Sequence, residues 1–229
     1  MLTEAVILAG GLGTRLRSVI KDLPKPMAEV NGKPFLHYLF VYLKNQGIKS
    51  VVLSVGYKHE IIQHHFGDNY IGIRIHYAIE DSPLGTGGAI KLAMEHITEE
   101  RCYVLNGDTY FDIDLHLLSQ LKGGCVIAAK MLTNFDRYGT ISINTEGEVE
   151  QFIEKKYSEK GFINGGVYCL EKSIFSTITE AKFSFETAVL EPLSSQGKVQ
   201  AVKCDGYFKD MGIPEDYAQI ERDFIQKKI

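Results

Sequence analysis

Three glycines and two cations near the N-terminus have the chemistry of a phosphate-binding site. Gly10, Gly11 and Gly13 follow a short apolar run, and Arg15 and Lys25 come after them. Backbone N–H groups of a glycine loop can point at phosphate oxygens because no side chain stands in the way, and cations neutralise charge that the backbone cannot. These residues predict a phosphate-binding loop at the end of a buried strand.

The spacing of these residues differs from that of two common nucleotide-binding motifs. A P-loop would end in Gly-Lys-Ser/Thr, whereas Gly13 is followed by Thr14 and Arg15. A dinucleotide-binding fingerprint would need a third glycine where Leu16 stands, and no acid follows the second predicted strand to hold a ribose. A tight strand-to-helix turn without a ligand is the other interpretation of the glycines.

Asp108, farther along the chain, has the chemistry of a magnesium ligand. It follows the apolar strand predicted at residues 102–105. An acid at the carboxyl end of a buried parallel strand points into the ligand crevice of the sheet, and carboxylate oxygens suit Mg²⁺. The Asn106-Gly107-Asp108 sequence is equally typical of a simple turn, so the residues alone leave both interpretations open.

Alternating apolar segments predict the elements that must position these residues. Helical spacing follows Pro34, a buried strand is expected at residues 50–54, an amphipathic helix at 58–66 and a strand at 73–79. Strands that alternate with helices indicate an α/β fold of three layers, with a doubly wound, mostly parallel, Rossmann-like sheet. Its ligand crevice would lie at the carboxyl ends of the strands.

From Gly123 onward the pattern changes to strands joined by turns. We expect strands at residues 125–131, 139–143, 149–153 and 162–170. Such runs predict a small antiparallel subregion on the sheet, a natural cradle for a second substrate. The length of 229 residues and the ample apolar content suit one large domain, so we expect residues 1–229 to form a single domain.

The composition argues against several classes of partner. The formal net charge is −4, and lysines and arginines are spread along the chain, so neither a nucleic-acid face nor a membrane face is indicated. No apolar run approaches a membrane span, and no signal-peptide pattern precedes the first strand, which predicts a cytoplasmic protein. The four cysteines are far apart in apolar segments, as expected for reduced core residues.

The segment from Leu8 to Leu16, together with Pro24-Lys25-Pro26-Met27, resembles the signature of the sugar-1-phosphate nucleotidyltransferases, also called nucleotide-sugar pyrophosphorylases. Later motifs extend the resemblance over nearly the whole chain. It implies transfer of a nucleotidyl group from a nucleoside triphosphate to a sugar 1-phosphate, release of pyrophosphate, Mg²⁺ as cofactor, and a nucleotidyltransferase fold whose antiparallel subregion binds the sugar.

The resemblance also implies roles for individual residues. Arg15 would hold the departing pyrophosphate, Lys25 would bridge phosphates, and Lys155 would orient the sugar phosphate. Asp108 and Asp210 would hold the metal. The implied nucleotide-binding residues are Leu8, Ala9, Gly10, Gly11, Gly13, Thr14, Arg15, Lys25, Gly85, Thr86 and Asp108. The implied sugar-phosphate-binding residues are Gly139, Glu154, Lys155, Asn164 and Gly166.

Three of these motifs leave alternatives. A Glu154-Lys155 pair is by itself typical of a solvated surface, and Lys156 stands where the family has proline. Ile213, after Asp210, stands where the family has threonine. The segment Leu84-Gly85-Thr86-Gly87-Gly88 resembles guanylyl-transferring members more than thymidylyl-transferring ones, and its glycines would let backbone groups approach a base.

Within the family, the sequence most resembles the guanylyltransferases that use GTP and D-glycero-D-manno-heptose 1-phosphate. The alternatives are a mannose-1-phosphate guanylyltransferase and a glucose-1-phosphate thymidylyl- or uridylyltransferase. Outside the family, the alternatives are a nucleotide-sugar-dependent glycosyltransferase and a non-catalytic nucleotide-sugar binding protein. Asp112-Ile113-Asp114 has the Asp-x-Asp form of the former, but acids at the start of a predicted helix serve equally well as caps. The oligomeric state, a homodimer included, is not fixed by the residues.

Overall fold

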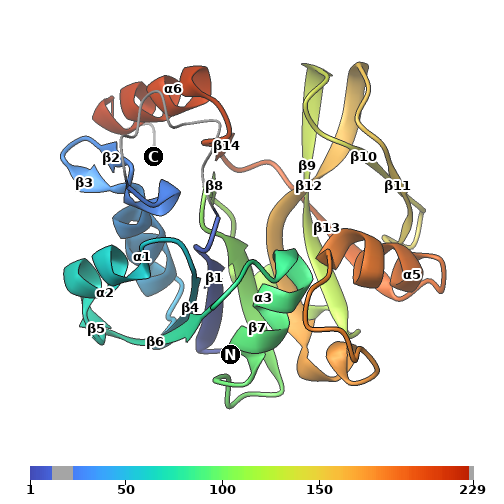
Figure 1. The fold of residues 1–229 in the computed structure, drawn as a ribbon. Helices are drawn as coiled ribbons and strands as arrows, with labels where there is room; N and C mark the ends of the chain where they lie inside the picture. The colour runs from blue at the N-terminus through green and yellow to red at the C-terminus, as the bar shows by residue number, and fades with distance from the viewer. Residues whose placement is uncertain (12–22, 227–229) are drawn as a thin grey trace.

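A mixed β-sheet runs through the molecule (Figure 1). The strands of this sheet are β1 Glu4–Leu8, β4 Ser50–Val55, β5 Asn69–Tyr70, β6 Ile73–Ile79, β7 Arg101–Asn106, β9 Cys125–Phe135, β10 Thr140–Ile143, β11 Val149–Ile153, β12 Ser158–Glu171 and β13 Val199–Cys204. The computed structural model describes residues 1–11 and 23–226. Within these ranges the strand order is β11-β10-β12-β7-β1-β4-β6-β5, with β9 pairing with both β12 and β13.

Strands β7, β1, β4 and β6 form the parallel centre of the sheet. The apolar runs of β1, β4 and β7 are buried on both faces, as parallel strands covered by helices require, whereas buried and exposed residues alternate along most of β6. The register places Leu8 of β1 beside Ser54 of β4 and Asn106 of β7. The carboxyl ends of these three strands therefore meet at one edge of the sheet.

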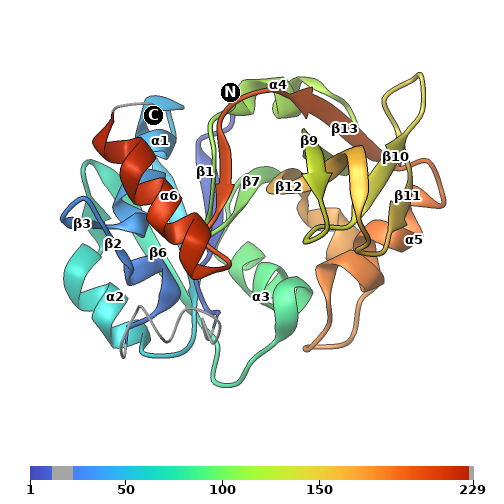
Figure 2. The ribbon, with the colours of Figure 1, turned by 90° about the horizontal axis from the view of Figure 1, so that it is seen from above.

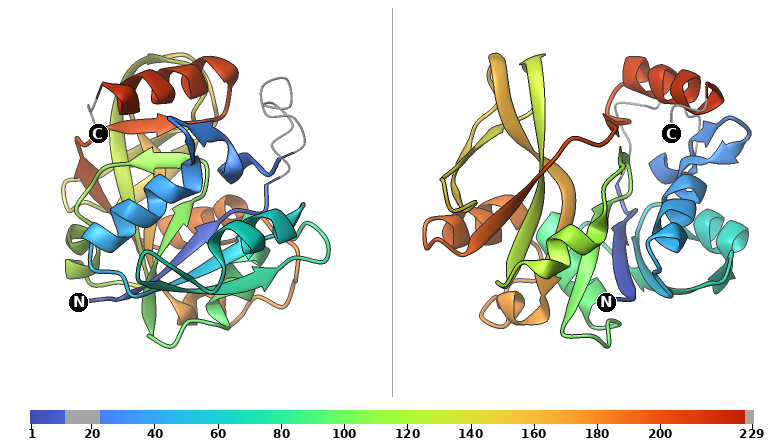
Figure 3. Two further views of the ribbon diagram at one scale, coloured as in Figure 1. Left: turned by 90° about the vertical axis from the view of Figure 1, so that its left-hand side faces the viewer. Right: turned by 180° about the vertical axis from the view of Figure 1, so that it is seen from behind.

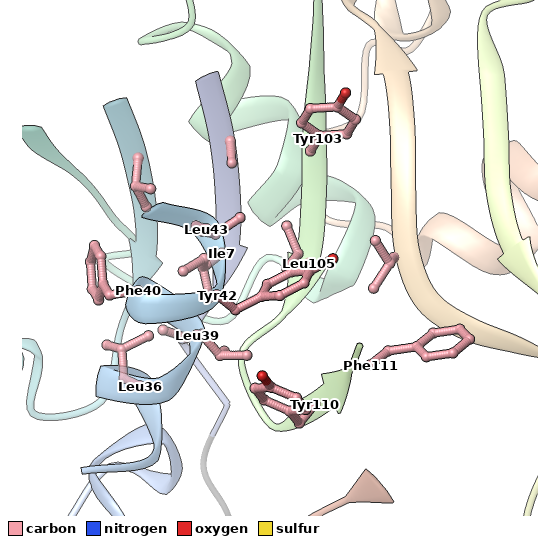
Figure 4. Close-up of a cluster of buried hydrophobic side chains, with 14 of the residues drawn as sticks. Ile7, Leu36, Leu39, Phe40, Tyr42, Leu43, Tyr103, Leu105, Tyr110 and Phe111 are labelled. Carbon is pink, nitrogen blue, oxygen red and sulfur yellow. The ribbon is translucent and has the colours of Figure 1, made fainter. Parts of the chain in front are cut away.

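Helices cover both faces of the parallel centre. They are α1 Phe35–Asn45, α2 His59–Phe66, α3 Gly85–Met94, α4 Leu115–Gln120, α5 Glu191–Ser194 and α6 Pro214–Ile225, with short turns η2 Lys25–Met27, η3 Lys172–Phe175 and the π-helix η4 Glu186–Leu190. Ala5 and Ile7 of β1 pack in the cluster that holds α1, whereas Val6 packs in the cluster that holds α3. Figure 4 shows Leu39 and Leu43 of α1 gathered with side chains of the sheet. The layers are helix, sheet and helix.

The antiparallel part of the sheet is organised by the long strand β12. Its C-terminal part pairs with β7, and two stretches of it, on either side of residues 165–167, pair with β9. The register shifts between Asn164 and Tyr168, so the strand bends there. Figure 2 shows β9 to β12 on one side of the molecule and α1, α2 and α6 on the other.

Two short ribbons complete the fold. Strand β8, Thr109–Phe111, pairs with β14, Phe208–Asp210, and β2, Glu29–Val30, pairs with β3, Lys33–Pro34. Helix α6 lies beside the β2–β3 ribbon (Figure 3). The Tyr217 hydroxyl donates a hydrogen bond to the Glu29 carbonyl. The ribbons attach the C-terminal segment to the strand ends of the sheet.

The predicted α/β fold, with a doubly wound parallel sheet and an antiparallel subregion, is confirmed. All four cysteines are buried and free, as expected. The β8–β14 ribbon and the η4–α5 segment were not predicted, because three-residue strands and a single π-turn are too short to give a periodic pattern. The six-residue strand β13 was also missed. No helix in the described part of the chain is long and apolar enough to cross a membrane.

Candidate active site

Two pockets open where the parallel strands end, and they meet at Asp108. The first, which we call the strand-end pocket, has a volume of about 390 Å³ and is lined by the ends of β1, β4 and β7 and the first turn of α3. The second, which we call the hairpin pocket, has a volume of about 590 Å³ and lies between the β10–β11 hairpin, β12 and the β8–β14 ribbon. Thr86, Asn106 and Asp108 line both pockets.

Gly107 brings the end of β7 against the end of β1. Its backbone N–H donates to the Leu8 carbonyl at 2.9 Å. A Cβ on this residue would lie only 2.4 Å from the same oxygen, so a larger residue would push the two strand ends apart. The close approach places Asp108, the next residue, beside the glycines that follow β1.

Lys25, Asp108 and Asp210 form a charged centre at the junction of the two pockets. The Lys25 ammonium Nζ lies 2.5 Å from Oδ2 of Asp108 and 4.0 Å from Oδ1 of Asp210. The β8–β14 ribbon brings the acids together, since Thr109 pairs with Asp210 and the Met211 N–H donates to the Asp108 carbonyl at 2.8 Å. Two carboxylates therefore share one ammonium.

Asp210 is the more deeply buried acid of this centre. Burial, followed by the neighbouring charge of Asp108, raises its pKa above the ordinary value, and the charges of Lys25 and Arg137 oppose that shift. The Tyr138 hydroxyl donates to Oδ2 of Asp210 at 3.4 Å. The ionised form of Asp210 is thus disfavoured beside Asp108, and an additional cation at this centre would stabilise it.

Glu80 is a second carboxylate in the lining of the strand-end pocket. It directly follows β6, and its two oxygens accept from the Ser54 hydroxyl at 3.2 Å and from the Leu84 N–H at 3.0 Å. A Cβ at Gly10 would lie 2.5 Å from Oε1 of Glu80, so glycine at that position makes room for this side chain. The hydrogen bonds fix an acceptor group inside the pocket.

The glycines at the start of α3 have a packing role. Cβ atoms at Gly85 and Gly88 would lie 2.6 Å from the Phe183 carbonyl oxygen and 2.1 Å from that of Ala181. The Gly87 N–H donates to the Phe183 carbonyl at 3.0 Å. We expected these glycines to let backbone groups approach a base, but their contacts are with the segment 181–183.

The hairpin pocket contains the residues predicted to bind a sugar phosphate. Glu154 and Lys155 follow β11, and both are exposed at its rim. Asn164 lies at the bend of β12, where its side chain accepts from the Gly166 N–H at 3.1 Å and donates to the Tyr168 hydroxyl at 2.9 Å. Gly139 allows close strand approach, because a Cβ there would lie 2.6 Å from the Ile153 carbonyl oxygen.

The structure gathers most of the predicted residues around these two pockets. Leu8, Gly10, Gly11, Lys25, Gly85, Thr86 and Asp108 line the strand-end pocket. Gly139, Glu154, Lys155, Asn164, Gly166 and Asp210 line the hairpin pocket. Ala9 is buried behind the strand end rather than in the lining. Gly13, Thr14 and Arg15 lie outside the described residues.

Three pocket acids were missed at the sequence level, namely Glu80, Glu186 and Glu191. A signal for Glu80 was present, because it follows a buried parallel strand as Asp108 does. The other two follow no pattern that sequence alone reveals. Asp114, from the Asp-x-Asp sequence, caps α4 by accepting from the His116 N–H at 2.9 Å, which weakens the glycosyltransferase interpretation.

Comparison with known proteins identifies the family. A family model described as nucleotidyl transferase matches residues 4–227. The chain belongs to the nucleotidyl transferase family. This confirms the resemblance seen in the glycine-rich segment, and the match covers both pockets of the nucleotidyl transferase fold.

Curated relatives in this nucleotidyl transferase family are similar over nearly their whole length. The D-glycero-alpha-D-manno-heptose 1-phosphate guanylyltransferase of Campylobacter jejuni subsp. jejuni serotype O:2 is 51% identical over 217 residues, which cover 93% of this chain and 96% of the relative. The protein of the same name from Aneurinibacillus thermoaerophilus is 50% identical over 226 residues, covering 96% and 97%. The crystal structure of HddC from Yersinia pseudotuberculosis complexed with GMP-PN matches with a TM-score of 0.85 at 40% identity, covering 97% of this chain and 100% of that chain.

Proposed function

We propose that this protein transfers a guanylyl group from GTP to D-glycero-D-manno-heptose 1-phosphate, releasing pyrophosphate and forming a GDP-heptose. Two relatives named for this activity are 51% and 50% identical to the chain. The similar HddC structure was crystallised with GMP-PN, which supports a guanine nucleotide. We further propose that residues 1–229 act as one catalytic domain, because the hairpin pocket is lined by residues from both halves of the chain and shares Asp108 with the strand-end pocket.

The position of Asp108 is the observation that carries the proposal. It lies where the strand-end pocket and the hairpin pocket meet, in contact with Lys25. A nucleotide in the first pocket and a sugar phosphate in the second would bring their phosphates together at this centre. That arrangement suits transfer between two phosphate-bearing substrates.

The reaction needs alignment and charge stabilisation more than acid–base groups. A phosphate oxygen of the sugar 1-phosphate would attack the α-phosphorus of GTP, forming one P–O bond while the bond from that phosphorus to the pyrophosphate oxygen breaks. A phosphate monoester, with a second pKa of about 6, is already ionised near neutral pH and needs no general base.

Cations of this chain would offset the repulsion between the two substrates. Like charges about 4 Å apart repel by about 4 kcal/mol per unit pair at a surface-like dielectric. Lys25 would bridge the reacting phosphates from the charged centre, and Lys155 would hold the sugar phosphate at the rim of the hairpin pocket. Arg15, from the glycine-rich segment, is proposed to hold the departing pyrophosphate.

Asp108 and Asp210 fit the role of magnesium ligands. They share one ammonium, and Mg²⁺ is commonly held by one or two carboxylates with phosphate oxygens and waters completing the coordination. Within residues 1–11 and 23–226, no cluster of three or more His, Cys, Asp or Glu side chains could hold a metal, in keeping with a site that a substrate completes. Bound there, magnesium would neutralise charge on the phosphoryl oxygens.

We assign guanine preference to Glu80. Guanine presents two neighbouring donors, N1–H and the N2 amino group, whereas adenine, uracil and thymine do not present this pair. A carboxylate can accept both, and hydrogen bonds to a charged acceptor are stronger than neutral ones. Ser54 and the Leu84 N–H hold the Glu80 carboxylate in the pocket, so the acceptor is in place before the base binds.

A coupled pyrophosphate-release assay tests the proposal. The purified protein is incubated with GTP, ATP, UTP or dTTP and with heptose, mannose or glucose 1-phosphate, and the sugar nucleotide is identified by mass. We expect the highest kcat/KM for GTP with the heptose 1-phosphate. If dTTP or UTP with glucose 1-phosphate gave the highest value, the guanylyl assignment would be wrong. Ligand binding without pyrophosphate release would favour the non-catalytic alternative.

A further inference from the structure

Two glutamates on one wall of the hairpin pocket have no part in the reaction as described above. Glu186 lies in η4 and Glu191 is the first residue of α5, and both line the pocket. Their negative charge is opposite to that of Lys155, the lysine proposed to bind the sugar phosphate. Among the described residues that line this pocket, Lys155 is the only cation.

A π-turn places both glutamates on the same wall. The Glu191 N–H donates to the Glu186 carbonyl, an i→i+5 bond that sets the two residues next to each other along the helix. In a regular α-helix, residues five apart would be separated by about 140° around the axis, because each residue turns by about 100°. The π-turn therefore explains how both Glu186 and Glu191 line the same wall of the hairpin pocket.

The two carboxylates differ in depth. Glu186 is half-buried, and its Oε2 accepts from the hydroxyls of Thr86 at 2.9 Å and Ser184 at 3.0 Å. Thr86 also lines the strand-end pocket, so Glu186 lies at the inner end of the hairpin pocket. Glu191 is exposed, one π-turn farther along the wall.

Electrostatics decide which part of a sugar phosphate these acids would contact. A phosphate dianion would be repelled by two carboxylates, so it would lie toward Lys155 and the Lys25 centre. The neutral, hydroxyl-rich part of the sugar would then lie along the glutamate wall, where each carboxylate oxygen can accept an O–H hydrogen bond. Glu186 already accepts two hydroxyl donors from the protein, and no described residue donates to its Oε1.

We propose that Glu186 and Glu191 bind the sugar hydroxyls and that Glu191 selects the heptose over a hexose. The inner Glu186 accepts from ring hydroxyls, which D-manno-heptose and mannose share. The outer Glu191 accepts from the exocyclic chain, where the heptose has one more hydroxyl-bearing carbon. This assignment rests on the sugar-1-phosphate guanylyltransferase function proposed above.

Steady-state kinetics with two acceptors test the assignment. With GTP saturating, Glu191→Gln should raise the KM for D-glycero-D-manno-heptose 1-phosphate about tenfold, the factor expected for losing about 1.4 kcal/mol of a charge-assisted hydrogen bond. The KM for mannose 1-phosphate should stay within about twofold by the same reasoning, since that sugar lacks the extra carbon. Glu186→Gln should raise the KM for both sugars, and the KM for GTP should not change in either variant.

Two control variants separate sugar binding from a structural effect. Glu180→Gln removes an exposed acid that does not line the pocket, and it should leave every KM unchanged. Ser184→Ala removes one hydroxyl that holds Glu186 but keeps the carboxylate, so its effect should be much smaller than that of Glu186→Gln. If Ser184→Ala matched Glu186→Gln, or if the KM for GTP rose in parallel, a sugar-binding role for Glu186 would be refuted.

The failure of this assignment is distinct from failure of the proposed function. A wild-type protein that forms no GDP-sugar from any acceptor would overturn the function itself. An active wild-type protein whose Glu191→Gln variant has an unchanged KM for the heptose 1-phosphate would overturn only the role of Glu191. An active wild-type protein that accepts hexose 1-phosphates alone would also overturn heptose selection.

Discussion

Lys25 and Asp108 form an ion pair, with 2.5 Å between Nζ and Oδ2, at the point where the two pockets meet. The pair joins a residue that follows the glycine-rich segment to one that follows β7. Lys25 lines the strand-end pocket, and Asp108 lines both pockets. In the proposed reaction, this ion pair would lie between the phosphates of the two substrates.

Replacing Lys25 by Ala should lower kcat about a hundredfold or more, because this ammonium acts on charge that develops on the phosphates. Folding should change far less, since Asp108 is partly exposed and can be solvated. Arg15→Ala, in the segment outside the described residues, should behave similarly. Lys33→Ala, an exposed lysine outside both pockets, is the matched control for turnover and melting temperature. Near-normal turnover in both test variants would contradict the assignment.

Changing Asp210 to Asn should raise the Mg²⁺ concentration needed for half-maximal activity, with little change in melting temperature. Asparagine keeps the shape but loses the negative charge that a hard cation prefers. A magnesium titration of kcat measures the shift, and Asp205→Asn, an exposed neighbour in sequence, serves as the control. Full activity in excess EDTA would rule out a metal at this centre, whereas an unchanged titration would remove only Asp210 from it.

Changing Glu80 to Gln should lower kcat/KM for GTP about tenfold or more, because an amide cannot accept two donors from guanine as a carboxylate does. The kcat/KM values for ATP and UTP should fall much less, so the preference for GTP over these triphosphates should become smaller. Initial rates with each triphosphate, at a fixed sugar 1-phosphate concentration, measure the change. Glu95→Gln, an exposed acid just after α3, should leave the discrimination intact. Equal losses for all bases would exclude base reading by Glu80.

Sequence patterns predicted the parallel strands of the sheet but not the packing of the glycines at the start of α3. Apolar runs and strand–helix alternation predicted the parallel strands, and with them the edge where Lys25, Asp108 and the glycines meet. The contact of Gly85 and Gly88 with the segment 181–183 could not be predicted, because it joins residues nearly a hundred positions apart. Packing between distant segments leaves no local periodicity.

The same limit applies to the hairpin pocket. Its strands were predicted from alternating apolar residues, but the bend at Asn164 and the π-turn after Glu186 depend on tertiary contacts. Asp210 was identified only through family resemblance, since nothing in a three-residue strand indicates that it pairs with β8. Chemistry-bearing residues were therefore easier to find than the partners that position them.

Gly88→Ala should destabilise the protein by about 1–3 kcal/mol, because the new methyl group would overlap the Ala181 carbonyl oxygen, 2.1 Å away, and force a backbone shift. Thermal melting measures the loss. Gly56→Ala is a suitable control, since a Cβ there would lie 3.5 Å from its nearest neighbour, an ordinary contact. Because the start of α3 lines the strand-end pocket and the segment 181–183 leads into Glu186, the Gly88 variant should also raise the KM values for both substrates. Equal melting temperatures for the two variants would contradict this packing role.

Stability should fall as the pH rises above about 9, because buried thiols stay protonated in the folded chain. Burial raises the pKa of Cys169 to about 11, and it raises the pKa values of Cys102 and Cys125 as well. The unfolded chain loses these protons from its ordinary pKa of 9.0 upward, so the folded state binds more protons and loses stability with rising pH. Melting temperatures between pH 8 and 11 should show this decline, with a shallower slope in Cys169→Ala. A pH-independent melting temperature would be inconsistent with the buried thiols.

The pairing of β8 with β14 joins Asp108 to a residue that lies close to the far end of the chain. During synthesis on a ribosome, the parallel strands and the strand-end pocket can form while Asp210 is still to be added. A growing chain would therefore form the strand-end pocket early and add its second carboxylate late. Until β14 docks, Lys25 would face Asp108 alone, so under the proposed function the emerging protein would bind a nucleotide before its centre for transfer is complete.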